Sequence, residues 1–130
     1  MKNEISYPID KTLSDVVNKK CPILHAFSIV GQKWKLPILW YLHEKPATRF
    51  NELKRRIPGI TTMMLTKSLR ELESCGLINR RVYEVIPPKV EYSLTSIGKE
   101  LLPTLNELYK WGLNHMDITL NNEEQSKFNR

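Results

Sequence analysis

Residues 58–76 constrain the fold most, because they form a short helical pattern with both ends marked. Pro58-Gly59 predicts a turn, and the Thr61 hydroxyl can accept a free backbone N–H of the first helical turn. Gly76 can end the helix in the left-handed conformation that glycine adopts at little cost. The sequence therefore predicts a helix that starts just after Thr61 and ends just before Gly76.

This helix has two faces of different chemistry. One face is an apolar stripe at helical spacing, made by Leu65, Leu69 and Leu72. The opposite face carries Met63, Thr66, Lys67, Arg70 and Ser74. Cations and small hydroxyls without an acid suit a DNA major groove, where cations meet phosphates and guanine edges. A solvated surface helix can show the same pattern, so the helix alone does not decide the function.

The segment that follows, residues 77–95, has the alternation of a β-hairpin. Ile78, Arg80 and Val82 alternate with polar or aromatic neighbours, as do Val90, Tyr92 and Leu94. Pro87-Pro88 cannot donate to a strand ladder, so we expect it at the tip. A helix that can enter the major groove, followed directly by a basic hairpin, is typical of a winged helix-turn-helix. The hairpin of such a protein, its wing, reaches the DNA backbone or minor groove.

The charge of the chain favours a polyanionic partner. The chain of 130 residues has a net charge of +6, and residues 49–91, with nine cations and five acids, supply +4 of it. No apolar run is long enough to span a membrane and no signal peptide is visible, so we expect a cytoplasmic protein. Two cysteines are too few for a Cys-x-x-Cys metal site, and we predict neither metal nor cofactor.

The predicted fold class is α+β and mainly helical. We expect an N-terminal arm over residues 1–20 and a winged helix-turn-helix domain with a two-stranded wing over residues 21–95. Within that domain, Thr48-Arg49-Phe50 is expected to be extended and to lie beside the wing. A C-terminal dimerisation helix over residues 96–120, capped by Thr95 and bent near Pro103, and a polar tail over residues 121–130 complete the chain.

The last predicted helix has more apolar surface than a small winged-helix core needs. Its apolar positions with helical period are Ile97, Leu101, Leu105, Leu108, Trp111 and Met116. The surplus favours packing against a second subunit, although burial within the same chain would also account for it. We favour a homodimer because two-fold symmetric proteins read palindromic operators.

Several motifs in order resemble the HxlR-type bacterial transcriptional regulators, which are winged-helix proteins of the MarR-like group. The motifs are Cys21-Pro22, Gly31-Gln-Lys-Trp-Lys35, Arg49-Phe50-x-Glu-Leu53, Ile57-Pro-Gly-Ile60, Met64-Leu-Thr-x-x-Leu-Arg-Glu-Leu-Glu73, Gly76-Leu77 and Pro87-Pro-x-Val-Glu-Tyr-x-Leu-Thr95. The resemblance covers residues 21–112. It implies homodimers that bind palindromic promoter sites on double-stranded DNA, as repressors or activators.

The resemblance also implies which residues meet DNA. The helix Thr62–Ser74 becomes the reader and the hairpin Leu77–Leu94 the wing. The expected DNA-binding residues are Thr62, Met63, Thr66, Lys67 and Arg70 on the reader, Arg49, Lys54 and Arg55 before it, and Arg80, Arg81 and Lys89 on the wing. Solvated surface charge is an equal alternative for Arg49, Lys54 and Arg55.

Cys21 is the candidate redox sensor. In the family that it resembles, the cysteine before the proline of the first helix is often a sensor thiol for a small electrophile or an oxidant. The sequence context suits a reactive thiol, because a helix N-terminus and neighbouring cations such as Lys19 and Lys20 favour the thiolate form of a cysteine. The alternative is a structural cysteine at a dimer contact. Cys75 departs from the usual pattern and is either a resolving partner for Cys21 of the other subunit or, as we favour, incidental.

Two other functions compete with DNA binding. An enzyme could use Cys21 as nucleophile with His25 as base, four residues on, but no orienting acid or oxyanion donor is identifiable. A winged helix used for protein interaction would more often expose an apolar patch where reader and wing here carry cations. We therefore predict a DNA-binding regulator and no enzyme, with thiol switching and a structural Cys21 both left open.

Overall fold

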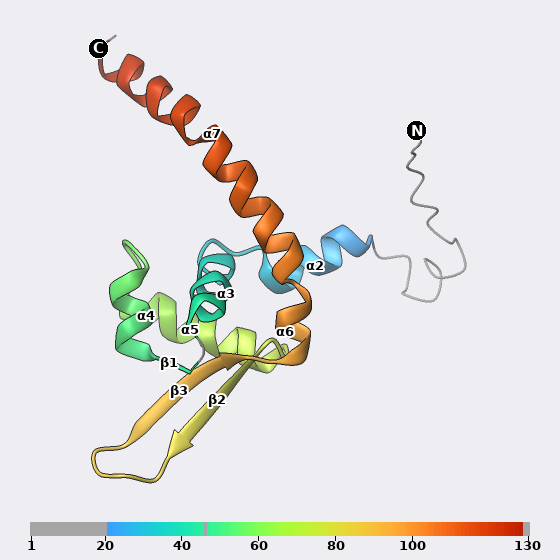
Figure 1. Cartoon of the computed structure of the whole chain (residues 1–130), viewed down its shortest axis with the longest axis vertical. Helices are drawn as coiled ribbons and strands as arrows, with labels where there is room; N and C mark the ends of the chain where they lie inside the picture. Colours follow the sequence, from blue (N-terminus) through green and yellow to red (C-terminus); the bar gives the residue numbers. More distant parts are fainter. Residues whose placement is uncertain (1–20, 46, 129–130) are drawn as a thin grey trace.

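The computed structural model describes residues 21–45 and 47–128, with side chains described to Met116. The predicted arm, residues 1–20, lies outside the described residues. In chain order the elements are α2 (Pro22–Val30), α3 (Lys35–Glu44), β1 (Thr48–Arg49), α4 (Phe50–Arg56), α5 (Thr62–Ser74), β2 (Ile78–Tyr83), β3 (Lys89–Leu94), α6 (Ser96–Glu100) and α7 (Leu102–Phe128). The predicted fold class is confirmed: the chain is mainly helical, with a small antiparallel sheet (Figure 1).

The reader helix α5 has the ends that its sequence predicts. The Thr61 hydroxyl accepts the Met64 N–H at 3.1 Å, which satisfies one of the free donors of the first turn. Gly76 follows the helix with a φ of +82°, in the left-handed region that favours glycine. The Leu77 N–H closes the end on the Leu72 carbonyl at 3.0 Å.

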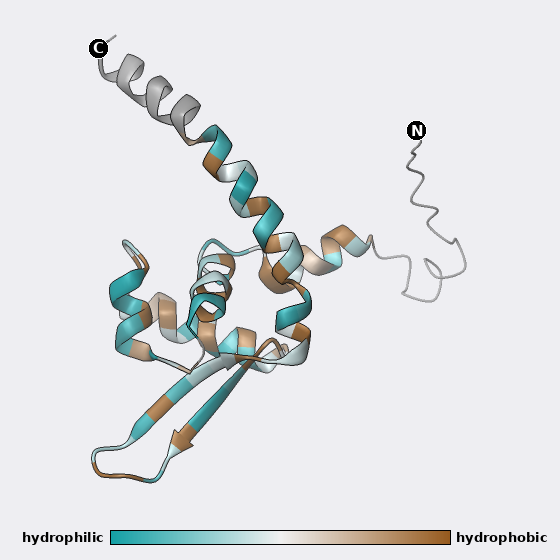
Figure 2. Cartoon of the chain, in the orientation of Figure 1, coloured by the Kyte–Doolittle hydropathy of each residue, from teal (hydrophilic) through white to brown (hydrophobic). Residues whose placement is uncertain are grey.

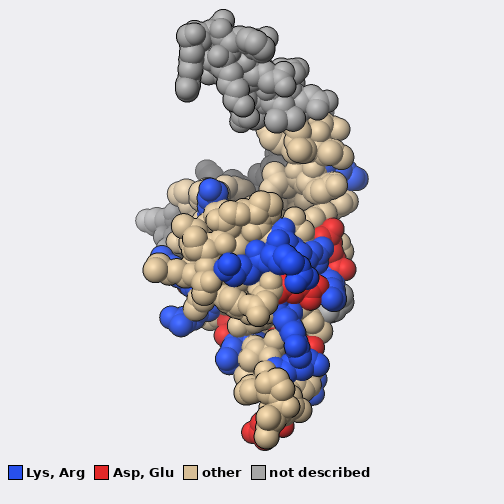
Figure 3. All heavy atoms as spheres, turned by 90° about the vertical axis from the view of Figure 1, so that its left-hand side faces the viewer, with Lys and Arg blue, Asp and Glu red and all other residues tan. Residues whose placement is uncertain are grey.

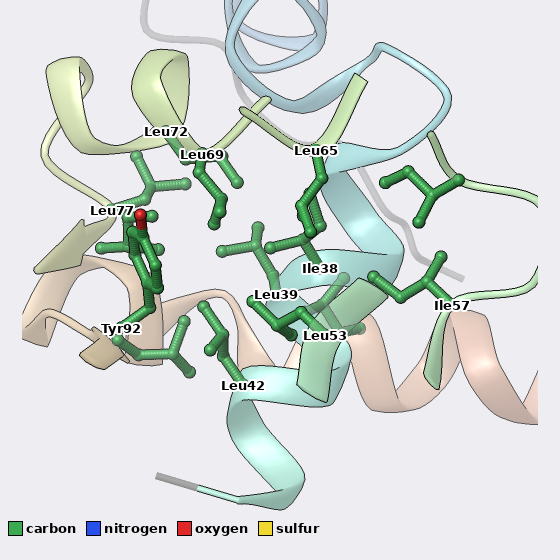
Figure 4. Close-up of a cluster of buried hydrophobic side chains, with 14 residues drawn as sticks. Ile38, Leu39, Leu42, Leu53, Ile57, Leu65, Leu69, Leu72, Leu77 and Tyr92 are labelled. Atoms are coloured by element: carbon green, nitrogen blue, oxygen red, sulfur yellow. The ribbon is translucent and has the colours of Figure 1, made fainter. Parts of the chain in front are cut away.

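The core lies between α3, α4, α5 and the sheet. Leu65, Leu69 and Leu72 of α5 are all buried and point toward Ile38 and Leu39 of α3 (Figure 4). The other buried apolar side chains are Leu42, Leu53, Ile57, Ile60, Leu77, Ile78, Tyr92, Leu94 and Leu105. The apolar stripe of the reader helix therefore holds it on the domain, and its opposite face stays exposed.

The sheet has three antiparallel strands in the order β1-β3-β2. Strand β1, which lies beside the two strands of the wing, is the predicted Thr48-Arg49 segment, and its Thr48 lies opposite Tyr92 of β3. Phe50 was predicted to be extended as well, but it is already the first residue of α4. Residues 84–88 join β2 to β3 and include the predicted Pro-Pro tip. Of the residues in β2 only Ile78 is buried, because the wing extends beyond the core (Figure 1).

The C-terminal helix differs from its prediction in two ways. The chain forms α6 and α7 rather than one helix, with the break at Leu101, whose N–H bonds back only three residues to Gly98 at 3.2 Å. Pro103, where a bend was predicted, lies in the first turn of α7, where its missing donor costs no helical hydrogen bond. Helix α7 also continues to Phe128, into the stretch predicted to be a polar tail.

Candidate nucleic-acid interface

The outward face of α5 carries all the predicted reader residues. Thr62, Met63, Thr66, Lys67 and Arg70 are exposed. Met63 is 80% exposed, which leaves a large apolar side chain in solvent beside the cations. The buried members of the helix are three leucines and Ser68. The apolar face and the polar face that the helical spacing predicts are therefore separated in the structure.

A hollow of about 340 Å³ lies between the reader helix and the sheet. Its polar lining includes Thr66 and Arg70 from α5 and Arg80 from β2. Phe50, Leu69 and Tyr92 supply the apolar part, and Glu73 adds one acid. The structure thus brings a predicted base-reading arginine and a predicted wing arginine to the same hollow.

A second hollow of about 450 Å³ lies where α4 meets the wing. It brings together three predicted cations, Arg49, Arg55 and Lys89. Phe50 lines both hollows, so they adjoin each other. Figure 3 shows Lys and Arg gathered on this face, around α4 and along the wing below it. Lys54 is exposed but does not line either hollow.

The acid that lines the second hollow, Glu52, is paired with a lysine outside that hollow. Glu52 lines the second hollow, and its carboxylate accepts a hydrogen bond of 2.7 Å from the Lys45 ammonium. This bond is the main reason why the pKa of Glu52 lies below its ordinary value. Arg56 pairs with Glu44 at 2.8 Å and lies 4.8 Å from the ring of Tyr41. Arg56 is therefore held toward α3 rather than toward the hollow.

Two of the three wing cations lie at one tyrosine ring. The Arg81 guanidinium lies 4.6 Å and the Lys89 ammonium 4.7 Å from the ring centre of Tyr83. Lys89 also pairs with Glu91 at 3.2 Å. A hydrogen bond from Tyr83 is the largest cause that lowers the pKa of Glu91, with burial opposing it and Lys89 reinforcing it.

Sequence reasoning missed Tyr83 and Glu91 as members of the site. A signal was available, because the hairpin register places Tyr83 opposite Lys89 and Arg81 opposite Glu91. Opposite residues on one face of a hairpin interact directly. Alternation alone predicted the strands, and reading the register across the turn would have found the cluster.

The two cysteines are free thiols on the surface. Cys21 is the N-cap of α2 with Pro22 at the start of the helix, as predicted, and its side chain makes no cap hydrogen bond. Cys75 is the C-cap residue of α5. Nothing in the described part of the chain gathers three or more metal-binding side chains. Among the described helices none is long and apolar enough to cross a bilayer.

A second surface is apolar rather than basic. Helix α2 has no buried residue, and Ile23, Leu24 and Phe27 are at least 64% exposed. On α7, Leu108, Tyr109, Trp111, Leu113 and Met116 are at least half exposed. Both helices extend away from the domain core, and both carry hydrophobic residues, α7 over its part up to Met116 (Figures 1 and 2). Contiguous exposed apolar surface is typical of interaction sites in proteins.

Comparison with known proteins identifies the family. Residues 29–119 match the family model of the HxlR-like helix-turn-helix. An "Uncharacterized HTH-type transcriptional regulator" of Methanothermobacter thermautotrophicus is 51% identical over 92 residues, which cover 71% of this chain and 70% of the relative.

Solved structures agree with this assignment. The putative HTH-type regulator YtcD, a Bacillus subtilis protein, has a TM-score of 0.70 at 45% identity, over 75% of this chain and 99% of the other. The redox regulator HypR in its reduced form has a TM-score of 0.72 at 40% identity, over 78% and 99%. The chain therefore belongs to the HxlR-like helix-turn-helix family, and it is a DNA-binding transcriptional regulator rather than an enzyme.

Proposed function

We propose that the chain binds a palindromic operator as a homodimer, with α5 in the major groove and the wing on the adjacent backbone or minor groove. The observation that carries the proposal is the shared position of the exposed α5 face, the two cation-lined hollows and the wing. A helix with hydroxyls and cations supplies base contacts, and cations beside it supply phosphate contacts.

The predicted residues divide into two roles under this proposal. Thr62, Met63, Thr66, Lys67 and Arg70 face base edges, and Arg70 has the bidentate geometry that suits guanine. The phosphate contacts are Arg49, Lys54, Arg55, Arg80, Arg81 and Lys89. Arg70 and Arg80 line the same hollow, which supports the proposal that one duplex meets both residues.

A second copy of this chain is the proposed occupant of the apolar surface on α2 and α7. Half-sites of a palindrome lie one helical turn or a multiple apart, so two linked readers are needed to bind both. Residues 21–95 then form the DNA-binding domain, and the C-terminal helical segment, residues 96–120, is the dimerisation element. Exposed Trp111, Leu113 and Met116 supply the apolar side chains for that contact.

The thiol of Cys21 is the proposed switch. It is exposed at the start of α2, three residues before Leu24, a member of the proposed dimer surface. An S-adduct at this position would add bulk where the two subunits meet. A disulfide between two such thiols would instead fix their relative position, with two electrons and two protons passing to the oxidant. The similarity to HypR, which is named a redox regulator, supports this proposal.

The test is a binding selection on genomic DNA fragments with the purified chain, reduced and after treatment with diamide, an oxidant that takes two electrons and two protons from two thiols as they form a disulfide. We expect a palindromic site that only the reduced chain binds. Cys21→Ser should bind in both conditions, and Cys75→Ser serves as the matched thiol control. Equal binding of the native chain in both conditions would leave a regulator with a structural Cys21. No enriched site at moderate salt would contradict the operator proposal and favour a protein-interaction module.

A further inference from the structure

The ion pair between Lys35 and Glu71 joins the first residue of α3 to the last turn of the reader helix. Lys35 is only 3% exposed and is the single buried Lys or Arg among the residues that the structure describes. Its ammonium lies 3.1 Å from Oε1 of Glu71, whose side chain is 35% exposed. That oxygen is buried and, among the described residues, accepts no well-aligned hydrogen bond, so charge rather than a directed bond holds the two groups together.

Local stability does not account for a lysine at this position. Burial of an ammonium group is unfavourable, and a buried ion pair is often no more stabilising than apolar side chains of the same size. Lys35 is also the first residue of α3, where a cation opposes the helix dipole and no acid lies in the first turn. The favourable partner is therefore Glu71, on another helix.

The pair restricts a motion that the apolar contacts of α5 leave open. Leu65, Leu69 and Leu72 pack on the core through contacts that do not depend strongly on direction. A small rotation of the helix about its axis would keep these leucines in contact with the core. It would separate Glu71 from the buried ammonium, and at low dielectric that separation is costly. Arg70 is the next residue along the helix, so the same rotation would displace it.

We propose that the Lys35–Glu71 pair sets the orientation of the reader helix and thereby determines how well the chain distinguishes its operator from other DNA. The inference rests on the proposed operator binding and adds two positioning residues that do not touch DNA. Lys35 follows α2 by a short connection, residues 31–34, so the pair also links the reader to the helix that Cys21 caps.

The decisive variant is the double substitution Lys35→Met/Glu71→Met, which keeps side-chain length and removes both charges. We expect an unfolding midpoint at or above that of the native chain, because no buried charge is left unpaired. We expect the ratio of operator to random-duplex affinity to fall about tenfold, the order of one misread base pair, with random-duplex affinity unchanged. Lys33→Met is the matched control, because Lys33 is exposed two residues earlier and lies over Trp34. An unchanged affinity ratio in the folded double variant would overturn the proposal.

Two further measurements keep the test independent of folding and of operator identity. Glu71→Gln keeps the size of the side chain and should lower the affinity ratio in the same direction, so an unchanged ratio overturns the proposal if the double variant does not fold. Residual dipolar couplings report the angle between α5 and α3 without DNA. An unchanged angle in the folded double variant would also overturn it. Failure of the native chain to select any operator would count against the proposed function. The measured angle between α5 and α3 would still test whether the Lys35–Glu71 pair sets the orientation of the reader helix.

Discussion

The hydroxyl of Thr95 donates a hydrogen bond of 2.7 Å to the backbone carbonyl of Gly76, 19 residues earlier in the chain. The same oxygen accepts the Gly98 N–H at 3.0 Å and so caps α6. One side chain therefore joins the end of the reader helix, the end of the wing and the start of the C-terminal helices. Through these two hydrogen bonds, a change in the angle of the C-terminal helices would also displace the end of the reader helix.

Thr95→Val should destabilise the chain by about 1–3 kcal/mol, because it keeps the shape of the side chain but removes a helix cap and a second hydrogen bond. Urea denaturation measures the change. Thr104→Val, on the exposed side of α7, is the control and should change the stability little. Equal stability of the two variants would show that the Thr95 bonds contribute nothing in solution.

Gly98→Ala should cost more stability than Gly76→Ala. A Cβ at Gly98 would overlap the Leu77 carbonyl oxygen, so the backbone must move to admit it. A Cβ at Gly76 has no neighbour within 4 Å, and only its φ of +82° opposes alanine, at about 1–2 kcal/mol. The unfolding midpoints of the two variants in urea make the comparison. The reverse order would mean that α6 can move away from the sheet without loss.

Signals that lie within a few residues of each other predicted most of the fold correctly. The Thr61 cap, the leucine stripe of α5 and the left-handed Gly76 depend on backbone geometry over a single helix, and all three are confirmed. The hairpin and its third strand, Thr48-Arg49, followed from alternation and from the winged-helix pattern. Such features need no knowledge of which distant segments meet.

Contacts between distant segments were not predicted. Lys35 and Glu71 are 36 residues apart, and nothing in either local pattern indicates that the lysine is buried. The Thr95 hydroxyl was predicted as a cap, whereas its bond to Gly76 depends on how the wing returns to the reader helix. For the candidate site, the sequence predicted the cations, and the structure shows which of them share a hollow. Their contacts with DNA stay a prediction.

Arg70→Ala and Arg81→Ala should affect DNA binding in different ways. Arg70 is expected to read a base, so its loss should weaken operator binding by about 1–3 kcal/mol and relax preference at one position. Arg81 is expected to contact a phosphate, so its loss should weaken all binding and reduce the salt slope by about 0.9. Titrations at several salt concentrations separate the two. Lys110→Ala, which removes a charge from α7, controls for net charge. Uniform loss in Arg70→Ala would reassign Arg70 to phosphate.

Tyr83→Phe should raise the pKa of Glu91 toward its ordinary value, because it removes the hydrogen bond that most lowers it. A lowered pKa in the folded state stabilises the fold above the unfolded pKa of a glutamate, about 4.3, and this contribution is lost as pH falls through the folded value. The variant should therefore show less loss of stability on acidification than the native chain. NMR titration of the Glu91 carboxyl measures the pKa directly. An unchanged pKa would show that Lys89, not Tyr83, controls this group.

Leu113→Glu should separate the proposed dimer into single chains. Leu113 is 56% exposed in the single chain, so the substitution places no charge in the core of the subunit. At a contact between two copies, however, the carboxylate would be desolvated without a partner, which is strongly unfavourable. Sedimentation velocity measures the outcome, and binding to a palindromic site should weaken more than binding to a half-site. Val85→Glu is the control for sedimentation, because Val85 is 50% exposed on the wing, away from α2 and α7. A Leu113→Glu variant that sediments like the native chain would place the contact between subunits elsewhere on the surface.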